Sequence, residues 1–205
     1  MKVAFINGSP RKSNGITAEL LAHLETKLPG CEITHGWEGL SEAPFACEGG
    51  ARRAGGAIVI AFPLYVDAIP SNLLRELAAH ETGLPPGTPV YALVNNGFYE
   101  GEQNANAVAM LRHWSKRAGL AWGQGIGVGA GGILNSQQPG RGPLKSLGKA
   151  LDVLARNILA GESGSDIYTR PDFPRALYKL GAEISFRAAI RKNGLSRRDV
   201  ERKLS

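Results

Sequence analysis

Short runs of apolar residues alternate along this chain with longer segments in which apolar residues recur every three or four positions. The runs fall at 3–6, 56–62 and 89–95, with weaker examples at 31–35 and 124–128. Such runs are typical of buried parallel strands, and the three-to-four spacing is typical of helices with one buried face. The helical segments are expected at 16–28, 70–81, 106–118 and 144–158. This alternation predicts an α/β fold with a five-stranded, doubly wound parallel sheet.

In a sheet of this kind, ligands meet the loops that follow the carboxyl ends of the strands. The first loop, residues 7–17, is rich in small and hydrogen-bonding residues. Small residues let backbone N–H groups approach an anion, and the start of the following helix adds a partial positive charge. The candidate phosphate-binding residues are Ser9, Arg11, Ser13, Asn14, Gly15, Ile16 and Thr17. The alternative is an ordinary strand–helix loop in which Asn14 caps the helix.

The second loop, residues 63–71, begins with Pro63, Leu64, Tyr65 and Val66. Its prolines stiffen the backbone, and Tyr65 offers a flat ring for stacking. Backbone N–H groups in this loop could reach the polar edge of a flat ligand. A turn with a buried tyrosine is the alternative.

The third loop, residues 95–103, begins with Asn95, Asn96, Gly97 and Phe98. Gly97 would permit a positive φ or a close approach of the backbone to a ligand. The two amide side chains supply donors and acceptors. A solvent-exposed loop with Asx turns is the alternative.

Gly8-Ser9-Pro10-Arg11 followed by Ser13-Asn14-Gly15-x-Thr17 resembles the phosphate loop of flavodoxin-like FMN proteins. The closest group is the NAD(P)H-dependent FMN reductases and the related iron–sulfur flavoproteins. Pro63-x-Tyr65 and the third loop resemble segments that contact the flavin ring in the same family. The resemblance spans roughly residues 2–135 by order of motifs. It implies a three-layer, flavodoxin-like fold with strand order 2-1-3-4-5.

The resemblance also implies a function, which is an FMN-dependent oxidoreductase with NADPH or NADH as electron donor. The acceptor would be a small molecule such as a quinone, a nitro or azo compound or free flavin. The cofactor would carry the redox chemistry, so no catalytic acid or base is expected among the side chains. A homodimer that completes the flavin pocket is implied as well. The alternative is a non-enzymatic electron carrier of the flavodoxin type, although such carriers are usually shorter and acidic.

The sequence lacks features of two known motifs, the cysteine cluster of iron–sulfur flavoproteins and the GxGxxG site for dinucleotides. Iron–sulfur flavoproteins carry a cysteine cluster before the third strand, whereas segment 46–53 holds only Cys47, and Cys31 is the other cysteine of the chain. A cubane cluster needs about four thiolates, so no cluster is expected, and the four histidines lack metal-ligand spacing. Residues 127–132 match the pattern GxGxxG, but no helix is expected directly after them, which disfavours a dinucleotide site there.

Composition and charge limit the class of protein, its compartment and its partners. The chain has 205 residues, of which 43% are hydrophobic and 20% charged, as expected for one globular α/β domain. The sequence enters its first strand directly after Met1 and has no run long enough to span a bilayer, so a cytoplasmic protein without a signal peptide is expected. We expect neither nucleic acid nor a membrane as partner.

The positive charge is concentrated at the end of the chain. Residues 170–205 contain ten basic and four acidic residues, a net charge of +6, which equals the net charge of the whole chain. We therefore divide the sequence into a flavodoxin-like domain, 1–165, and a basic helical extension, 166–205. Leu177, Leu180 and Ile184 form an apolar stripe in the extension. Packing of this helix against the domain or a partner subunit is favoured over a membrane-surface helix, and nucleic-acid binding is favoured least.

Overall fold

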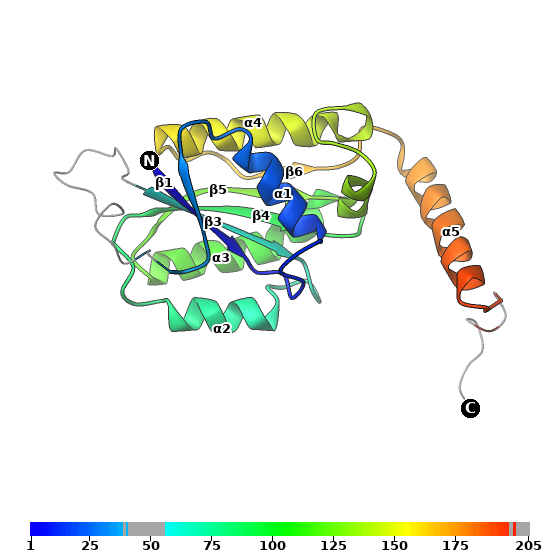
Figure 1. Ribbon diagram of the computed structural model, residues 1–205, viewed down its shortest axis with the longest axis horizontal. Coiled ribbons are helices and arrows are strands. Elements are labelled where there is room, and N and C mark those ends of the chain that lie inside the picture. The colour runs from blue at the N-terminus through cyan, green and yellow to red at the C-terminus, as the bar shows by residue number, and fades with distance from the viewer. Residues whose placement is uncertain (39, 41–55, 197–198, 200–205) are drawn as a thin grey trace. The chain divides into compact units, whose positions relative to one another are not determined.

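The computed structural model describes residues 1–38, 40, 56–196 and 199. Figure 1 shows the arrangement of its elements. The strands are β1 (Lys2–Asn7), β2 (Glu32–His35), β3 (Gly56–Pro63), β4 (Pro89–Asn95), β5 (Ala121–Val128) and β6 (Ile167–Thr169). The α-helices are α1 (Ile16–Glu25), α2 (Ser71–Ala79), α3 (Ala105–Arg117), α4 (Lys145–Ala160) and α5 (Arg175–Lys192). Short 3₁₀ helices lie at Gly101–Asn104, Gly131–Asn135 and Gly142–Leu144.

Within the described residues the strands form one parallel sheet in the order β2-β1-β3-β4-β5-β6. The predicted order 2-1-3-4-5 and the α/β class are confirmed. The sequence analysis missed β6, because three residues are too few to show an alternating pattern. Pairing of β6 with β5 requires a glycine at position 127, since a Cβ there would collide with the ring of Tyr168.

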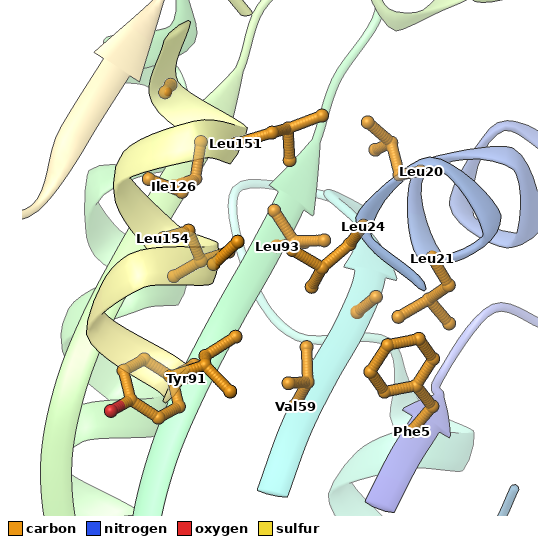
Figure 2. Close-up of a cluster of buried hydrophobic side chains, with 14 of the residues drawn as sticks. Phe5, Leu20, Leu21, Leu24, Val59, Tyr91, Leu93, Ile126, Leu151 and Leu154 are labelled. Carbon is orange, nitrogen blue, oxygen red and sulfur yellow. The ribbon is translucent and has the colours of Figure 1, made fainter. Parts of the chain in front are cut away.

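The sheet is covered on both faces, which gives three layers. Helices α1 and α4 lie on one side of the sheet and α2 and α3 on the other (Figure 1). Figure 2 shows the first of the two cores, in which leucines of α1 and α4 pack onto β1, β3, β4 and β5. Burial on both faces explains why the central strands are almost continuously apolar.

Tyr91 packs its ring into the first core and carries a polar hydroxyl group (Figure 2). Its hydroxyl group lies 2.9 Å from the carbonyl oxygen of Asn157 and 2.8 Å from that of Glu162, and donates to this pair. Burial raises the pKa of Tyr91, so the phenol stays protonated and can act as donor over the usual pH range. The bond ties strand β4 to the end of helix α4.

Element boundaries differ from the expected ones by a few residues. The first helix was expected to reach residue 28, but α1 ends at Glu25, while Leu28 still packs into the core. No helix was expected directly after residues 127–132, and the structure has the short 3₁₀ helix Gly131–Asn135 at this point. Cys47 and the rest of segment 46–53 lie outside the described residues.

Contacts divide the chain into two compact units, Met1–Pro171 and Asp172–Ser205. The first contains the whole sheet, including β6, and the second contains α5. The assignment of residues 166–205 as a separate extension stays a prediction. None of the described helices combines the length and the hydrophobicity that crossing a membrane requires.

Candidate functional site

The three loops singled out from the sequence follow β1, β3 and β4, which are neighbours in the sheet. Their carboxyl ends therefore meet at one edge. After β1 the chain moves outward to β2, whereas β3 lies on the other side of β1, so this edge includes the point where the direction of winding reverses. Ligands of open α/β sheets bind at such a point.

The first loop is shaped by Asn7, a residue that the sequence analysis did not include in the site. Its side-chain oxygen accepts a hydrogen bond from the backbone N–H of Ser9 at 3.0 Å, and its amide nitrogen donates to the carbonyl of Lys12 at 3.0 Å. Ser9 then accepts from the N–H of Arg11 at 3.2 Å. An Asn at a strand end followed by Gly is an Asx-turn signal that could have identified this role.

The two cations of the first loop differ in their environment. The amino group of Lys12 lies 3.1 Å from the carbonyl oxygen of Asn7 and 3.2 Å from Glu76 in α2. The second carboxylate oxygen of Glu76 accepts a bond from Trp37 at 3.0 Å. The guanidinium of Arg11 is exposed and has no hydrogen-bond or ion-pair partner among the described residues. Arg11 is therefore the cation available to a bound anion.

The start of α1 presents free backbone donors beside Arg11. The N-cap residue is Gly15, and no side chain caps the helix. Asn14 has a φ of 60° and lies outside the helix, so the alternative in which Asn14 caps it is wrong. Within the described residues, no acceptor is found for the N–H groups of Gly15 and Ile16. Such groups, together with the helix dipole, favour an anion at this position.

One buried residue, Asn95, connects the three loops. Its side-chain oxygen accepts a hydrogen bond from the hydroxyl of Thr17 at 3.0 Å, and both residues are buried. Its carbonyl oxygen accepts from the N–H of Leu64 at 2.7 Å. The hydroxyl of Thr17 thus donates its proton to Asn95, and the backbone N–H of Thr17 is the donor that is left for a phosphate.

The second loop contains a tight, strained turn. Tyr65 and Ala68 exchange two backbone hydrogen bonds, at 3.2 and 3.0 Å. The residues between them, Val66 and Asp67, have φ values of 49° and 57°. A β-branched residue in the left-handed region costs about 1–3 kcal/mol. Asp67 tolerates the left-handed region, but Val66 does not favour it, so the conformation of this turn could not be recognised from the sequence.

This turn holds large side chains out in solvent. Tyr65 is 48% exposed and Val66 is 99% exposed. The alternative of a turn with a buried tyrosine is therefore wrong. Exposed, flat and apolar side chains at the ligand-binding edge of a sheet are suited to contact a planar ligand.

The third loop folds around Asn96. Its side-chain oxygen accepts from the N–H of Phe98 at 2.9 Å, and its amide nitrogen donates to the carbonyl of Glu100 at 3.1 Å. This is the Asx geometry considered as an alternative, so the side chain of Asn96 serves the loop itself. It leaves Phe98 exposed, with an exposed fraction of 56%.

Gly97 differs from its expected conformation. Its φ does not lie in the left-handed region, so the expected positive φ is wrong. A Cβ added at this position would meet no atom within 4 Å. Neither the backbone conformation nor packing within the described residues thus requires a glycine here, and the space beside Gly97 is open.

Residues 129–132, which match part of a dinucleotide-binding pattern, support the other loops. Gly131 donates to the carbonyl of Asn96 at 2.8 Å, and Ala130 donates to that of Phe98 at 2.5 Å. A Cβ at Gly131 would lie 3.2 Å from Ile16 in α1. Close packing of this segment against the first and third loops explains Gly129, where a Cβ would collide with the carbonyl oxygen of Tyr99, and Gly131.

The residues present fit an FMN molecule. The N–H groups at the start of α1 and the guanidinium of Arg11, which have no partner in the described part of the chain, suit its terminal phosphate. Tyr65, Phe98 and the open space at Gly97 suit a flat ring. In the part of the chain that the structure describes, no group of three or more His, Cys, Asp or Glu residues could hold a metal ion.

Comparison with known proteins finds solved structures with a similar fold, but no similar family model or curated sequence. No protein-family model and no curated protein sequence matches the chain. An apo NADH:FMN oxidoreductase is similar with a TM-score of 0.54 and 15% identity, over 80% of this chain and 90% of that one. A flavoenzyme NAD(P)H:(acceptor) oxidoreductase from Paracoccus denitrificans is similar with a TM-score of 0.52 and 14% identity, over 78% and 95%.

A third structure, rubredoxin oxygen:oxidoreductase from Desulfovibrio gigas, matches with a TM-score of 0.48 and 17% identity over 78% of this chain. The match spans 35% of that longer protein. The two structures with TM-scores above 0.5 and the order of the strands in the sheet indicate the same fold. The chain therefore has the flavodoxin-like fold, which it shares with flavin-dependent NAD(P)H oxidoreductases.

Proposed function

We propose that this protein is an FMN-dependent oxidoreductase that takes electrons from NADPH or NADH and passes them to a small-molecule acceptor. The observation that carries the proposal is the start of α1, which no side chain caps: among the described residues, the N–H groups of Gly15 and Ile16 have no acceptor and the guanidinium of Arg11 has no partner. A doubly charged phosphate matches this arrangement, because weak backbone donors, a helix dipole and one guanidinium belong to the same short loop, in which the backbone of Arg11 lies close to Gly15.

Each residue of the first loop has a distinct part in this proposal. Ser13 and Asn14, which are exposed, and the N–H groups of Gly15, Ile16 and Thr17 would bind the phosphate together with Arg11. Ser9 is buried and accepts a bond from Arg11, so it would set the shape of the loop. Lys12, held by Glu76, would act in the same indirect way.

The second and third loops would hold the ring. Pro63 and Leu64 continue strand β3 into the turn, and Tyr65 and Val66 project from it. Asn95 and Asn96 fix the backbone on the other side, where Gly97 leaves room and Phe98 is exposed. Because these contacts come from backbone and apolar groups, they would orient a ring without supplying an acid or base.

Bound FMN would supply the redox chemistry, accepting a hydride and releasing electrons to the acceptor. The chain would contribute binding, orientation and exclusion of water from one side of the ring. The two solved structures with TM-scores above 0.5 are named as NAD(P)H- or NADH-dependent flavin oxidoreductases, which supports this class of reaction. Acceptors that fit an open, apolar rim are planar molecules such as quinones, nitro or azo compounds and free flavin.

A homodimer belongs to the same proposal. Tyr65, Val66 and Phe98 form an exposed apolar rim at the site, and such rims mark contact surfaces. A second subunit placed over this rim would complete the pocket and shield the ring. The protein would then function in the cytoplasm, without a metal ion, as a dimer with one FMN per chain.

The decisive test is to load the purified protein with FMN and to measure NADPH and NADH oxidation with a neutral quinone as acceptor. We expect bound FMN in preference to FAD, because the first loop accommodates a terminal phosphate, and quinone-dependent oxidation of at least one nucleotide. Loading with FMN but no oxidation of either nucleotide would instead indicate an electron carrier. Failure to bind any flavin would contradict the proposal as a whole.

Replacing Arg11 tests the phosphate assignment. We expect Arg11→Ala to weaken FMN binding by about tenfold to a hundredfold, because a charge-assisted bond of about 1.5–3 kcal/mol is lost. The dissociation constant is measured by quenching of FMN fluorescence. Arg156→Ala, which removes an exposed arginine from α4, is the matched control and should leave it unchanged. Equal constants for the wild type and Arg11→Ala would show that the first loop does not hold the phosphate.

Replacing Gly97 tests the proposal that the third loop contacts the flavin ring. Since a Cβ at position 97 meets no protein atom, Gly97→Val should keep its melting temperature but lose FMN affinity. Gly8→Val is the opposite control, because a Cβ there would lie 2.5 Å from Leu73 and should destabilise the fold. A Gly97→Val protein that binds FMN as the wild type does would remove the third loop from the site.

A further inference from the structure

Helix α2 begins directly after the second loop and packs against the first loop. The buried residues Ile69 and Pro70 end the second loop, and Ser71 starts the helix. Leu73 of α2 lies so close to Gly8 that a Cβ on this glycine would be 2.5 Å from the leucine side chain. One helix therefore adjoins both the loop proposed to hold the phosphate and a loop proposed to hold the ring.

A hydrogen bond from Asn72 joins α2 to the start of the first loop. The amide nitrogen of Asn72 donates to the carbonyl oxygen of Gly8 at 3.0 Å. Gly8 is buried, and its N–H donates to the carbonyl oxygen of Ala61 in β3 at 2.8 Å. Among the described residues, no other group donates to the Gly8 carbonyl. Without Asn72 this buried acceptor would have no partner in the described part of the chain, which is a costly arrangement.

The side chain of Asn72 serves the first loop and not the helix that carries it. Asparagine near a helix start commonly caps the helix, but no side chain caps α2, whose N-cap residue is Pro70. Asn106 is the second residue of α3, as Asn72 is of α2, and its exposed side chain has no partner among the described residues. The bond to Gly8 is thus what distinguishes Asn72 from a residue of the same type at the same helix position.

A second contact with the first loop lies one helical turn further along α2. Glu76 accepts a bond from the ammonium group of Lys12 at 3.2 Å and from the indole N–H of Trp37 at 3.0 Å. The side chains of Lys12 and Glu76 are 61% and 31% exposed, and exposed ion pairs contribute little to stability. Because the Gly8 carbonyl is buried, we assign the larger part of the attachment to Asn72.

The two contacts enclose the part of the first loop that contains Arg11. Residues 9–11 lie between Gly8 and Lys12, and the N–H of Arg11 donates to the side chain of Ser9 within that stretch. Since the stretch has three residues and both flanking residues contact α2, its backbone is restricted at each end. A loop that is ordered before binding loses less conformational entropy when an anion binds.

We propose that Asn72 is a positioning residue of the flavin site, which fixes the first loop to the helix that follows the second loop. This role rests on the proposed function, in which the first loop binds the FMN phosphate. Because the amide of Asn72 bonds to the first loop alone, Asn72 acts on the phosphate half of the flavin and not on the ring half. A residue needed only for the stability of α2 would instead affect both halves.

The test compares Asn72→Ala with Asn106→Ala in the full chain. Both variants remove an asparagine side chain from the second position of a helix, so they change helix propensity alike. Dissociation constants are measured for FMN and for riboflavin, which has the same ring and ribityl chain but no phosphate. Hydrogen–deuterium exchange of the ligand-free proteins gives a second measurement on the first loop that needs no flavin.

We expect Asn72→Ala to weaken FMN binding by about tenfold and to leave riboflavin binding unchanged, while Asn106→Ala alters neither. In the ligand-free protein, Asn72→Ala should accelerate exchange at residues 9–13 and leave it unchanged at residues 96–98. An unchanged FMN constant, an equal loss for FMN and riboflavin, or unchanged exchange at residues 9–13 would overturn the proposal. A wild type that binds no flavin would contradict the proposed function itself, and exchange would still decide whether Asn72 holds the loop.

Discussion

The buried hydrogen bond between Thr17 and Asn95 is the contact on which the candidate site depends. It joins the first turn of α1 to the end of β4, and the same Asn95 accepts the backbone N–H of Leu64 from the second loop. Both side chains are buried, so removing either partner would leave a polar group without compensation, at a cost of about 1–3 kcal/mol. Three loops that are far apart in the sequence are thereby held in one arrangement.

This arrangement separates two kinds of surface at the edge of the sheet. Around the start of α1, internal bonds of Asn7, Ser9 and Lys12 shape the backbone, and no residue that the structure describes pairs with the guanidinium of Arg11 or the first N–H groups of the helix. Around the ends of β3 and β4, a strained turn and an Asx turn hold Tyr65, Val66 and Phe98 in solvent. An anion-binding end and a flat apolar end together match a molecule with a phosphate, a linker and a ring.

The sequence predicted the parts of this structure that rest on periodicity and on position along the chain. Strands β1, β3 and β4 are apolar because both of their faces are buried, and the three loops follow from strand ends alone. It did not predict β6, which is too short for a pattern, or the turn at Val66, where two backbone hydrogen bonds between Tyr65 and Ala68 close around a residue of unsuitable propensity. The backbone of Gly97 and the inward hydroxyl of Thr17 likewise depend on neighbours that only the folded chain brings together.

The central claim is that the three loops act as one FMN site, and hydrogen–deuterium exchange with and without FMN tests it most directly. The backbone amides of residues 14–17, 64–67 and 96–98 report on the first, second and third loops. We expect FMN to slow exchange in all three segments at once and to leave α5 unchanged. FMN binding that slows exchange in only one segment, or elsewhere in the chain, would contradict it.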